Sequence, residues 1–272
     1  MLPIENRNIQ ATVATNGKEA VAEDKLNILE PLRANLVMVQ AGANYMTGLV
    51  GNVSIPVYSG SNVGWAGEID AATNGAGNFT EVVLEPKRIT AYIDISKQFL
   101  LQDSTSAEAL LRADIVRAIS NKLEATILGD AAGNSKQPAG LFNDADIIED
   151  VTYPSMVEMI QTLEEANVSG DIKYIVSPAV KAALKTTSKD AGSGRFVMEA
   201  NEVDGVEVLS TSACKGIVVG NFADYVIGQW GSIDLTVDPY SQATNGKVRL
   251  VVNAYFDAKP RRAEAFVKKV LA

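Results

Sequence analysis

The sequence predicts an α+β fold, in which helices and strands mix without the regular alternation of a doubly wound α/β protein. Three observations lead to this class. Residues 89–95 alternate between apolar and polar side chains, which is the period of a half-buried strand. Residues 105–129 place an apolar side chain at every fourth position from Leu111 to Ile127, which indicates a helix with one buried face. Residues 150–245 then hold short apolar runs, capped helices and turns in no fixed order.

Composition limits the class of protein further. The 272 residues, 47% of them hydrophobic, are enough for one large domain or two smaller ones. Asp and Glu outnumber Lys and Arg by 33 to 24, which argues against a dedicated nucleic-acid binder, because such proteins need clustered basic side chains. No apolar run approaches the ~18 residues of a membrane span, and the first residues do not resemble a signal peptide. We therefore expect a soluble protein, made and kept in cytoplasm, that contacts no membrane.

The chain contains no histidine, which removes the most frequent general base and transition-metal ligand. Cys214 is the single cysteine and, without a histidine partner, is expected to be a small packed residue. Residues 129–136 lack the residue order of a phosphate-binding loop. The acidic run 144–150 lacks the glycine and the spaced glutamate of a calcium loop, and we interpret it as a solvated linker. The sequence thus predicts no enzyme, no cofactor and no metal site.

The first third of the chain divides into three segments. Residues 1–29 are mostly polar and are interpreted as an extended N-terminal arm. Residues 30–56 end in a predicted strand that Pro56 restricts to an edge or a bulge. Residues 57–83 are rich in Gly, Asn and Ala between two strand signals, and we interpret them as a long two-stranded finger.

The finger contains two aromatic residues, Trp65 and Phe79, whose sequence neighbours cannot build a core around them. Leaving such rings in water is unfavourable, because each carries a large apolar surface. Either the segment folds back and packs Trp65 on its own domain, or another molecule covers the rings.

The helices and strands after residue 104 are predicted from the residues at their ends. Thr105 and Glu108 occupy the positions of a capping box at the start of the long helix, and Gly129 suits a left-handed cap at its end. Pro154 begins a second helix, and Ser177 caps a third. The closing residues are predicted to form two strands broken at Lys259-Pro260, and the basic side chains around that break are interpreted as a solvated strand face.

Several separated stretches share their order and spacing with one protein family. They are GWAGEIDAA…NFTEVVLEPKRITAYIDISKQFLLQDS, the long helix ending in ILGD, QPAGLF, IVSPAVKAALKTTSKDAGSGRF, VDGVEVLSTS, VVGNFADYVIG and PRRAEAFVKK. Together, from about Gly48 to Lys269, they resemble the major capsid proteins of tailed bacteriophages with the Hong Kong 97 fold.

The resemblance implies a division of the chain. Residues 1–29 would be the N-terminal arm, 57–83 the extended loop reaching over the next subunit, and 150–245 the axial domain around the five- and six-fold axes. The peripheral domain would comprise 30–56, 84–149 with the spine helix 105–129, and the closing strands 246–272.

The resemblance also implies a function. The protein would self-assemble as hexamers and pentamers into the icosahedral head shell that encloses double-stranded DNA without sequence-specific binding. Its partners would be portal and scaffolding proteins, its place of assembly the host bacterial cytoplasm, and its location the virion. The net charge of −9 fits an inner wall that does not hold the genome during packaging.

The expected intersubunit contacts lie on the extended loop, because aromatic anchors within an adaptable polar segment are typical of interfaces. They are Tyr58, Trp65, Glu68, Phe79 and Glu81.

Two features depart from the family. Some relatives cross-link through a loop lysine, a neighbouring asparagine and an assisting carboxylate, whereas residues 57–83 contain no lysine and Lys87 lies beyond them. We therefore predict no autocatalytic cross-linking. Relatives often carry a scaffolding segment before the arm; here the arm begins at Met1, so scaffolding is expected from a separate protein or from a trimmed precursor.

Two alternatives stay open. An encapsulin-like nanocompartment shell would share the fold and hold a cargo enzyme instead of DNA. A histidine-free monomeric enzyme would use residues 57–83 as a lid over a pocket containing a carboxylate or lysine site.

Overall fold

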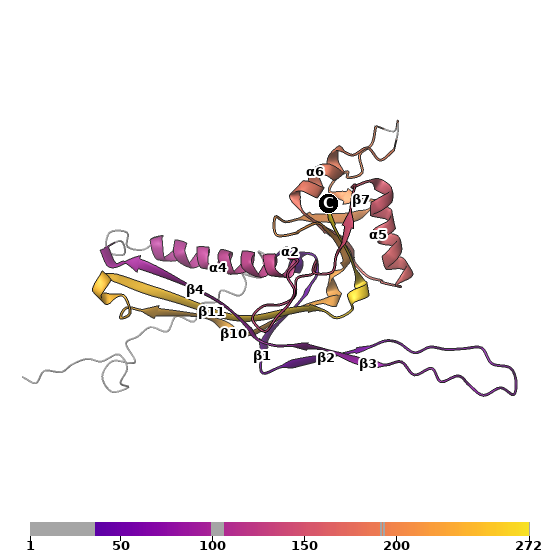
Figure 1. Cartoon of the computed structure of the whole chain (residues 1–272), viewed down its shortest axis with the longest axis horizontal. Coiled ribbons are helices and arrows are strands. Elements are labelled where there is room, and N and C mark those ends of the chain that lie inside the picture. Colours follow the sequence, from indigo (N-terminus) through magenta and orange to yellow (C-terminus); the bar gives the residue numbers. More distant parts are fainter. Residues whose placement is uncertain (1–35, 99–105, 191, 193, 272) are drawn as a thin grey trace, which may run out of the picture.

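The computed structural model of the chain describes residues 36–98, 106–190, 192 and 194–271. The expected arm 1–29 and the capping residue Thr105 lie outside the described residues. The described part contains sheets of four, six and two strands together with helices (Figure 1). This is the mixed helix and sheet architecture that the sequence predicts.

The four-stranded sheet forms an elongated layer with the strand order β1, β10, β11, β4. These strands span Asn44–Leu49, Tyr225–Asp238, Lys247–Pro260 and Lys87–Ser96, respectively. β1 runs parallel to β10, and the other two pairs are antiparallel. The alternation seen in 89–95 belongs to the edge strand β4, and helix α4 (Ser106–Ile127) lies along this layer (Figure 1).

The six-stranded sheet forms a second layer with the strand order β5, β12, β9, β6, β8, β7. These strands span Asp146–Ile148, Phe266–Leu271, Ile217–Asn221, Ile172–Val176, Val206–Ser210 and Glu202–Val203, respectively. Helices α5 (Tyr153–Glu165) and α6 (Pro178–Thr186) pack beside it (Figure 1). Met156, Met159 and Leu163 of α5 are fully buried, because they share the face that the sheet covers.

One antiparallel ribbon runs through both sheets. β9 pairs with β12 in the six-stranded sheet, and the same two segments continue as β10 and β11, which pair in the four-stranded sheet. The turns Phe222–Asp224 and Ala263–Ala265 join the two halves of the ribbon. Between these turns Arg262 donates from Nη2 and Nε to Asp224 Oδ2 at 2.5 and 2.9 Å.

The ribbon crosses the expected domain boundaries. β10 lies within the range 150–245 but belongs to the four-stranded sheet, whereas β12, within 246–272, belongs to the six-stranded sheet. β11 continues through Pro260, which pairs with Tyr225, so the break follows the proline. Boundaries drawn along the sequence miss this crossing because the strand pairs that define it are non-local.

Two interpretations of charged segments are also wrong. The acidic run 144–150 is not a linker, because Asp146–Ile148 form the edge strand β5. The basic side chains near the end of the chain do not form a solvated face, because β12 is an inner strand. Lys268 pairs with Asp144, and Lys269 Nζ lies 3.6 Å from a carboxylate oxygen of Glu158, with both lysines largely covered.

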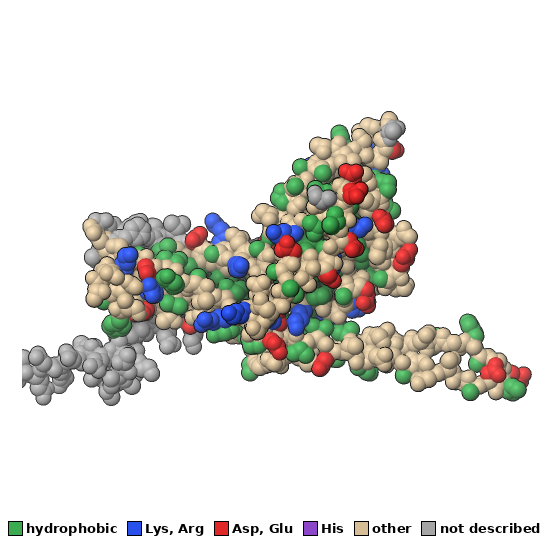
Figure 2. Space-filling view, viewed as in Figure 1, with side chains coloured by type: hydrophobic (Ala, Val, Ile, Leu, Met, Phe, Trp, Pro, Cys, Tyr) green, Lys and Arg blue, Asp and Glu red, His purple; other side chains and the backbone are tan. Residues whose placement is uncertain are grey.

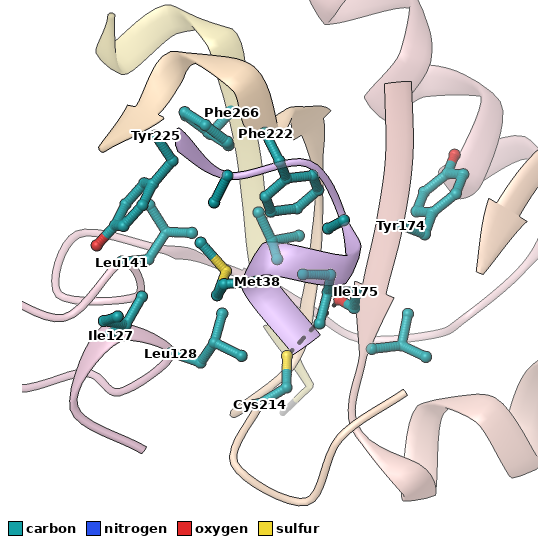
Figure 3. Packing of buried hydrophobic residues seen from close by; sticks show 14 of the residues in the cluster. Met38, Ile127, Leu128, Leu141, Tyr174, Ile175, Cys214, Phe222, Tyr225 and Phe266 are labelled. Atoms are coloured by element: carbon teal, nitrogen blue, oxygen red, sulfur yellow. Dashed lines mark hydrogen bonds between the residues drawn. The ribbon is translucent and has the colours of Figure 1, made fainter. Parts of the chain in front are cut away.

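A single apolar core connects the two layers (Figure 3). Helix α2 (Val37–Gln40) inserts the fully buried Met38 between the layers. The rings of Phe222 and Tyr225 meet Phe266 edge-on, with centroids 5.5 and 5.9 Å apart. Burying a side chain of this size stabilises the fold by about 1.5–3 kcal/mol. Cys214 is buried against the same core, as predicted, and its thiol lies 3.6 Å from the carbonyl oxygen of Ile175.

The ends of the helices can be compared with the capping residues that the sequence predicts. Thr152 caps α5, which begins at Tyr153, one residue before the predicted start at Pro154. Ser177 caps α6 as predicted. The predicted cap at Gly129 is wrong, because α4 ends at Ile127 and Gly129 does not have a positive φ. Instead, the carbonyl groups of Ile127 and Gly129 accept hydrogen bonds from the backbone N–H groups of 141 and 142 at 2.7 and 2.9 Å.

Candidate intersubunit interface

The most prominent surface feature is a finger, residues 53–84, that projects from the body (Figure 1). Strands β2 (Val53–Tyr58) and β3 (Phe79–Leu84) pair antiparallel as a separate two-stranded sheet. Pro56 fits this sheet because each of its strands has a free edge. Residues 59–78 continue beyond the strands as a long loop.

The base of the finger is anchored to the four-stranded sheet. Leu84 is buried against Val226 and Trp230, and the indole N–H of Trp230 donates to the carbonyl oxygen of Gly51 at 2.6 Å. Lys259 Nζ donates to the carbonyl oxygen of Val83 at 2.6 Å. Because apolar and polar contacts both hold it, the base has a defined direction relative to the body.

An aromatic pair lies at the end of the two paired strands, where the loop begins. The rings of Tyr58 and Phe79 face each other across the strands, with centroids 4.7 Å apart and an interplanar angle of 35°. The Tyr58 hydroxyl lies 2.7 Å from Ser61 Oγ and accepts from the backbone N–H of Gly77 at 3.1 Å. The contact with Ser61, followed by that with Gly77, lowers the pKa of Tyr58. The pair therefore fixes the point at which the loop leaves the strands.

The glycines of the loop allow its two arms to approach each other. Asn62 N–H donates to the carbonyl oxygen of Gly75 at 3.0 Å. A Cβ at Gly75 would lie 2.0 Å from the carbonyl oxygen of Asn62, and one at Gly77 would lie 1.9 Å from that of Gly60. The glycine-rich composition thus follows from backbone packing within the finger.

The tip of the finger, residues 63–70, presents apolar side chains to solvent. Asp70 accepts from Gly67 N–H at 3.0 Å and forms a turn around Glu68 and Ile69. Trp65 is 105% exposed, Val63 91% and Ile69 97%. These are the values of free side chains, so the tip packs on no described part of its own chain. This excludes the reading in which Trp65 packs at the finger's base.

Three further observations concern the described residues. No group of three or more Asp, Glu or Cys residues within the described ranges is placed to hold a metal ion. Cys214 is not a ready nucleophile, because burial raises the pKa of its thiol to about 12. Among the described helices, none is long and apolar enough to cross a membrane. The finger is the candidate functional surface because its tip exposes Val63, Trp65 and Ile69 to solvent.

Comparison with known proteins shows the family to which the chain belongs. Residues 24–270 match the model of the phage capsid family. The chain belongs to that family. It is 30% identical over 246 residues to the major capsid protein of Halomonas phage phiHAP-1, an alignment covering 87% of this chain and 41% of the relative. The chain thus spans about two-fifths of the length of that curated relative.

Solved capsid structures share the fold of this family member. The capsid of a native GTA particle superposes with a TM-score of 0.71 at 17% identity, covering 97% of this chain and 99% of that chain. A structure from Microbacterium phage Oxtober96 gives 0.71 at 12% identity, covering 97% and 100%. One from Gordonia phage Cozz gives 0.68 at 14%, covering 87% and 86%.

The five expected contact residues of this capsid-family chain fall into two groups. Trp65 and Glu68 lie at the tip and are both exposed to solvent. Tyr58, Phe79 and Glu81 lie near the strands, where each has a partner within the finger; Glu81 accepts from Ser54 Oγ at 2.6 Å. The second group therefore supports the finger internally as well as being exposed.

Two further tip residues, Val63 and Ile69, were not predicted as contacts. Each is a β-branched apolar residue isolated among polar and small residues, the same signal that singled out Trp65. That signal was available in the sequence. The turn that the hydrogen bond from Gly67 to Asp70 forms at the tip was not.

Proposed function

We propose that the protein is the self-assembling subunit of the icosahedral head shell of a tailed bacteriophage, with the Hong Kong 97-type capsid fold. The observation that carries this proposal is the anchored finger whose apolar tip has no cover within its own described chain. Membership of the phage capsid family supports it. If the finger of each subunit contacts the body of the next, the contact is head-to-tail. Head-to-tail contacts can close into rings, and rings joined at other axes close into a container.

In this proposal the finger, residues 53–84, contains the predicted loop 57–83. It contacts the next subunit through Tyr58, Trp65, Glu68, Phe79 and Glu81. The four-stranded sheet with α4 as its spine helix serves as the peripheral domain. The six-stranded sheet with α5 and α6 serves as the axial domain around the five- and six-fold axes. This division follows the sheets instead of the sequence ranges 84–149, 150–245 and 246–272.

The remaining parts of the proposal concern partners and place. The shell encloses double-stranded DNA without reading its sequence, which fits a chain with a net charge of −9. Portal and scaffolding proteins are the other partners, and the particle assembles in the cytoplasm of its bacterial host before becoming the virion.

Neither alternative is favoured by an observation. A lid would lie over a pocket, whereas the finger points away from the body and its tip side chains are free (Figure 1). A nanocompartment shell would be distinguished by a cargo enzyme inside the purified particle in place of DNA.

The test measures assembly and folding separately. Light scattering and negative-stain microscopy of the purified protein should reveal closed shells or five- and six-membered rings. Trp65→Ala should reduce assembly strongly, because an interface tryptophan often contributes about 2 kcal/mol or more per contact. Trp65→Phe, which keeps an aromatic ring, should lose less, and Ala72→Ser, at an exposed position in the same loop, should change little.

Two results would contradict parts of the proposal. Particles of unchanged yield and size from Trp65→Ala would remove the tip from the interface. A stable monomer at all salt and protein concentrations, with or without a coexpressed scaffold, would contradict the shell function itself.

A further inference from the structure

The tetrapeptide Ala-Thr-Asn-Gly occurs in the chain at residues 14–17, 72–75 and 243–246. The first copy lies outside the described residues, and the other two place Asn74 and Asn245 directly before a glycine. Asparagine is a chemically labile residue, and a following glycine has no side chain to hinder approach to its backbone nitrogen. Because the two described copies share one local sequence, any difference in their reactivity reports the folded structure.

The copy at 243–246 is held in a hydrogen-bonded turn. Ala243–Asn245 form a 3₁₀ turn within the connection between β10 and β11, and Gly246 follows it with a φ of 64°. The backbone N–H of Gly246 donates to the carbonyl oxygen of Ala243 at 3.1 Å. The side-chain amide of Asn245 donates to Gln242 Oε1 at 2.7 Å. The glycine nitrogen and the asparagine amide are thus both engaged in hydrogen bonds.

The copy at 72–75 lies in the finger loop and belongs to no helix or strand. Asn74 is exposed, and the N–H of Gly75 donates to no acceptor within the described part of the chain. The carbonyl oxygen of Gly75 does accept from Asn62 N–H at 3.0 Å. The opposite arm therefore holds Gly75 in position and leaves its nitrogen free.

The side chain of Asn74 is placed beside this free nitrogen. Its Oδ1 accepts from the backbone N–H of Ala76 at 3.1 Å, which holds the side-chain carbonyl group next to the peptide unit of Gly75. A donor to that oxygen also stabilises the negative charge that develops on it when a nucleophile attacks the carbonyl carbon. The loop therefore combines a nucleophile with a polarised carbonyl group.

The glycine of this pair is required by the packing of the finger. A Cβ at Gly75 would lie 2.0 Å from the carbonyl oxygen of Asn62, so a larger residue would push the two arms apart. The residue that leaves Asn74 unprotected is thus the one that the close approach of the arms demands.

We propose that Asn74 is a site of spontaneous deamidation, in which the backbone nitrogen of Gly75 attacks the side-chain carbonyl carbon. The bond from this nitrogen to Cγ forms, the bond from Cγ to Nδ2 breaks, and the Gly75 proton leaves with the amide as ammonia. Water then opens the resulting succinimide ring. Opening at Cγ gives aspartate, and opening at the backbone carbonyl carbon gives isoaspartate. The reaction needs only water and the folded chain, so it does not depend on the proposed shell function.

Both products change the surface of the finger. Residues 59–78 carry the acidic residues Glu68 and Asp70 and no Lys or Arg, and acidic side chains are visible at the end of the finger in Figure 2. Each conversion therefore adds a third carboxylate to the loop. Isoaspartate also lengthens the backbone by one carbon before Gly75, which displaces its carbonyl oxygen from Asn62 N–H. An aged chain thus has a more acidic finger and, with isoaspartate, a less ordered one.

The closing experiment follows both sites in one protein. The full-length chain is incubated in mildly alkaline buffer and digested with trypsin, which places Asn74 and Asn245 in different peptides. Mass spectrometry measures the fraction of each peptide in which an amide has become a carboxyl group, and fragment spectra locate the change. Asn74 should convert about fivefold or more faster, because Gly246 must first lose a hydrogen bond. Equal rates, or faster conversion of Asn245, would overturn the proposal.

Two controls separate the structure from the sequence. In urea the two copies share a tetrapeptide and no fold, so their rates should become equal. A difference that persists in urea would assign the selectivity to flanking residues and overturn the structural account. Asn74→Gln should abolish the change in the finger peptide, because a glutamine would have to form a larger ring. A change that persists in this variant would place the reaction at another asparagine.

Hydrogen exchange tests the consequence for the finger. Ion-exchange chromatography separates aged chains, which carry one more negative charge, from fresh ones. Exchange in residues 59–78 should accelerate in the isoaspartate fraction and stay unchanged in the two large sheets. Unaltered exchange in that fraction would overturn the effect assigned to the lengthened backbone.

Discussion

The carboxylate of Asp257 lies 2.8 Å from the ammonium group of Lys87, and both side chains are buried where the finger joins the sheet. The second carboxylate oxygen accepts from the backbone N–H of Glu85 at 3.0 Å. Asp257 therefore links β11, β4 and the residue that follows the finger. The same ion pair occupies Lys87, the lysine nearest to the finger, so its amine is not available to a neighbouring chain.

Asp257→Ala should destabilise the unassembled subunit by about 3 kcal/mol or more, because it leaves the Lys87 cation buried without a counter-charge. Urea unfolding followed by circular dichroism measures this change. The matched control is Asp94→Ala, which breaks a partly exposed ion pair with Arg249 between the same two strands. The control should have a much smaller effect. Equal losses in the two variants would contradict a buried, structural role for the Lys87 pair.

Glu124 should make stability depend on pH. Its side chain is 6% exposed, and burial raises its pKa above the ordinary 4.5, although bonds from Val37 N–H and Thr211 oppose the shift. The folded state then holds the proton at a pH where the unfolded state has lost it. The free energy of unfolding should therefore fall as pH rises from 4.5 through the folded-state pKa.

Glu124→Gln should remove this part of the slope and should keep an oxygen that accepts from Val37 N–H. Urea unfolding of both proteins across that pH range measures the difference. Glu164→Gln, an exposed position on α5, serves as the control and should retain the wild-type slope. A wild-type slope in Glu124→Gln would show that another group titrates there.

Tyr58→Phe should loosen the finger without unfolding the body. The substitution keeps the ring against Phe79 but removes the hydroxyl that contacts Ser61 and Gly77. Hydrogen exchange should accelerate in residues 59–78 and stay unchanged in the two large sheets. Tyr240→Phe, an exposed tyrosine outside the finger, should leave the loop's exchange rate unaltered.

Cys214 should resist thiol reagents in the native protein at neutral pH. Burial, the largest cause, raises the pKa of its thiol to about 12, so the reactive thiolate is scarce. Ellman's reagent should detect no thiol in the folded protein and one per chain in urea. Rapid reaction under native conditions would mean that the core around Met38 opens readily.

Local signals predicted the helices well because capping depends on adjacent residues. Ser177 caps α6, and the four-residue apolar period marks α4, so both are found from sequence alone. The predicted helix cap at Gly129 was wrong because the chain near Gly140 packs against Gly129. A Cβ on Gly140 would lie 2.1 Å from the Gly129 carbonyl oxygen. Only the tertiary structure reveals such a contact.

Strand pairing was the part that sequence could not supply. Nothing local to β10 or β12 indicates which sheet each joins, because the partners lie far along the chain. The structure of the finger was predicted in part, whereas its contacts with a neighbour stay a prediction. The exposure of Trp65 follows from its neighbours, whereas the internal partners of Tyr58 and Glu81 depend on the register of β2 with β3.

The ribbon shared by the two large sheets has a mechanical consequence. Its two crossings lie side by side, tied by Arg262 and Asp224, so a relative tilt of the sheets bends the ribbon like a hinge. Twisting one sheet against the other would instead shear the two crossings apart. In the proposed shell, five-membered and six-membered rings of identical chains would differ in curvature. Tilting at the crossing would supply that difference while leaving the hydrogen bonds within each sheet intact.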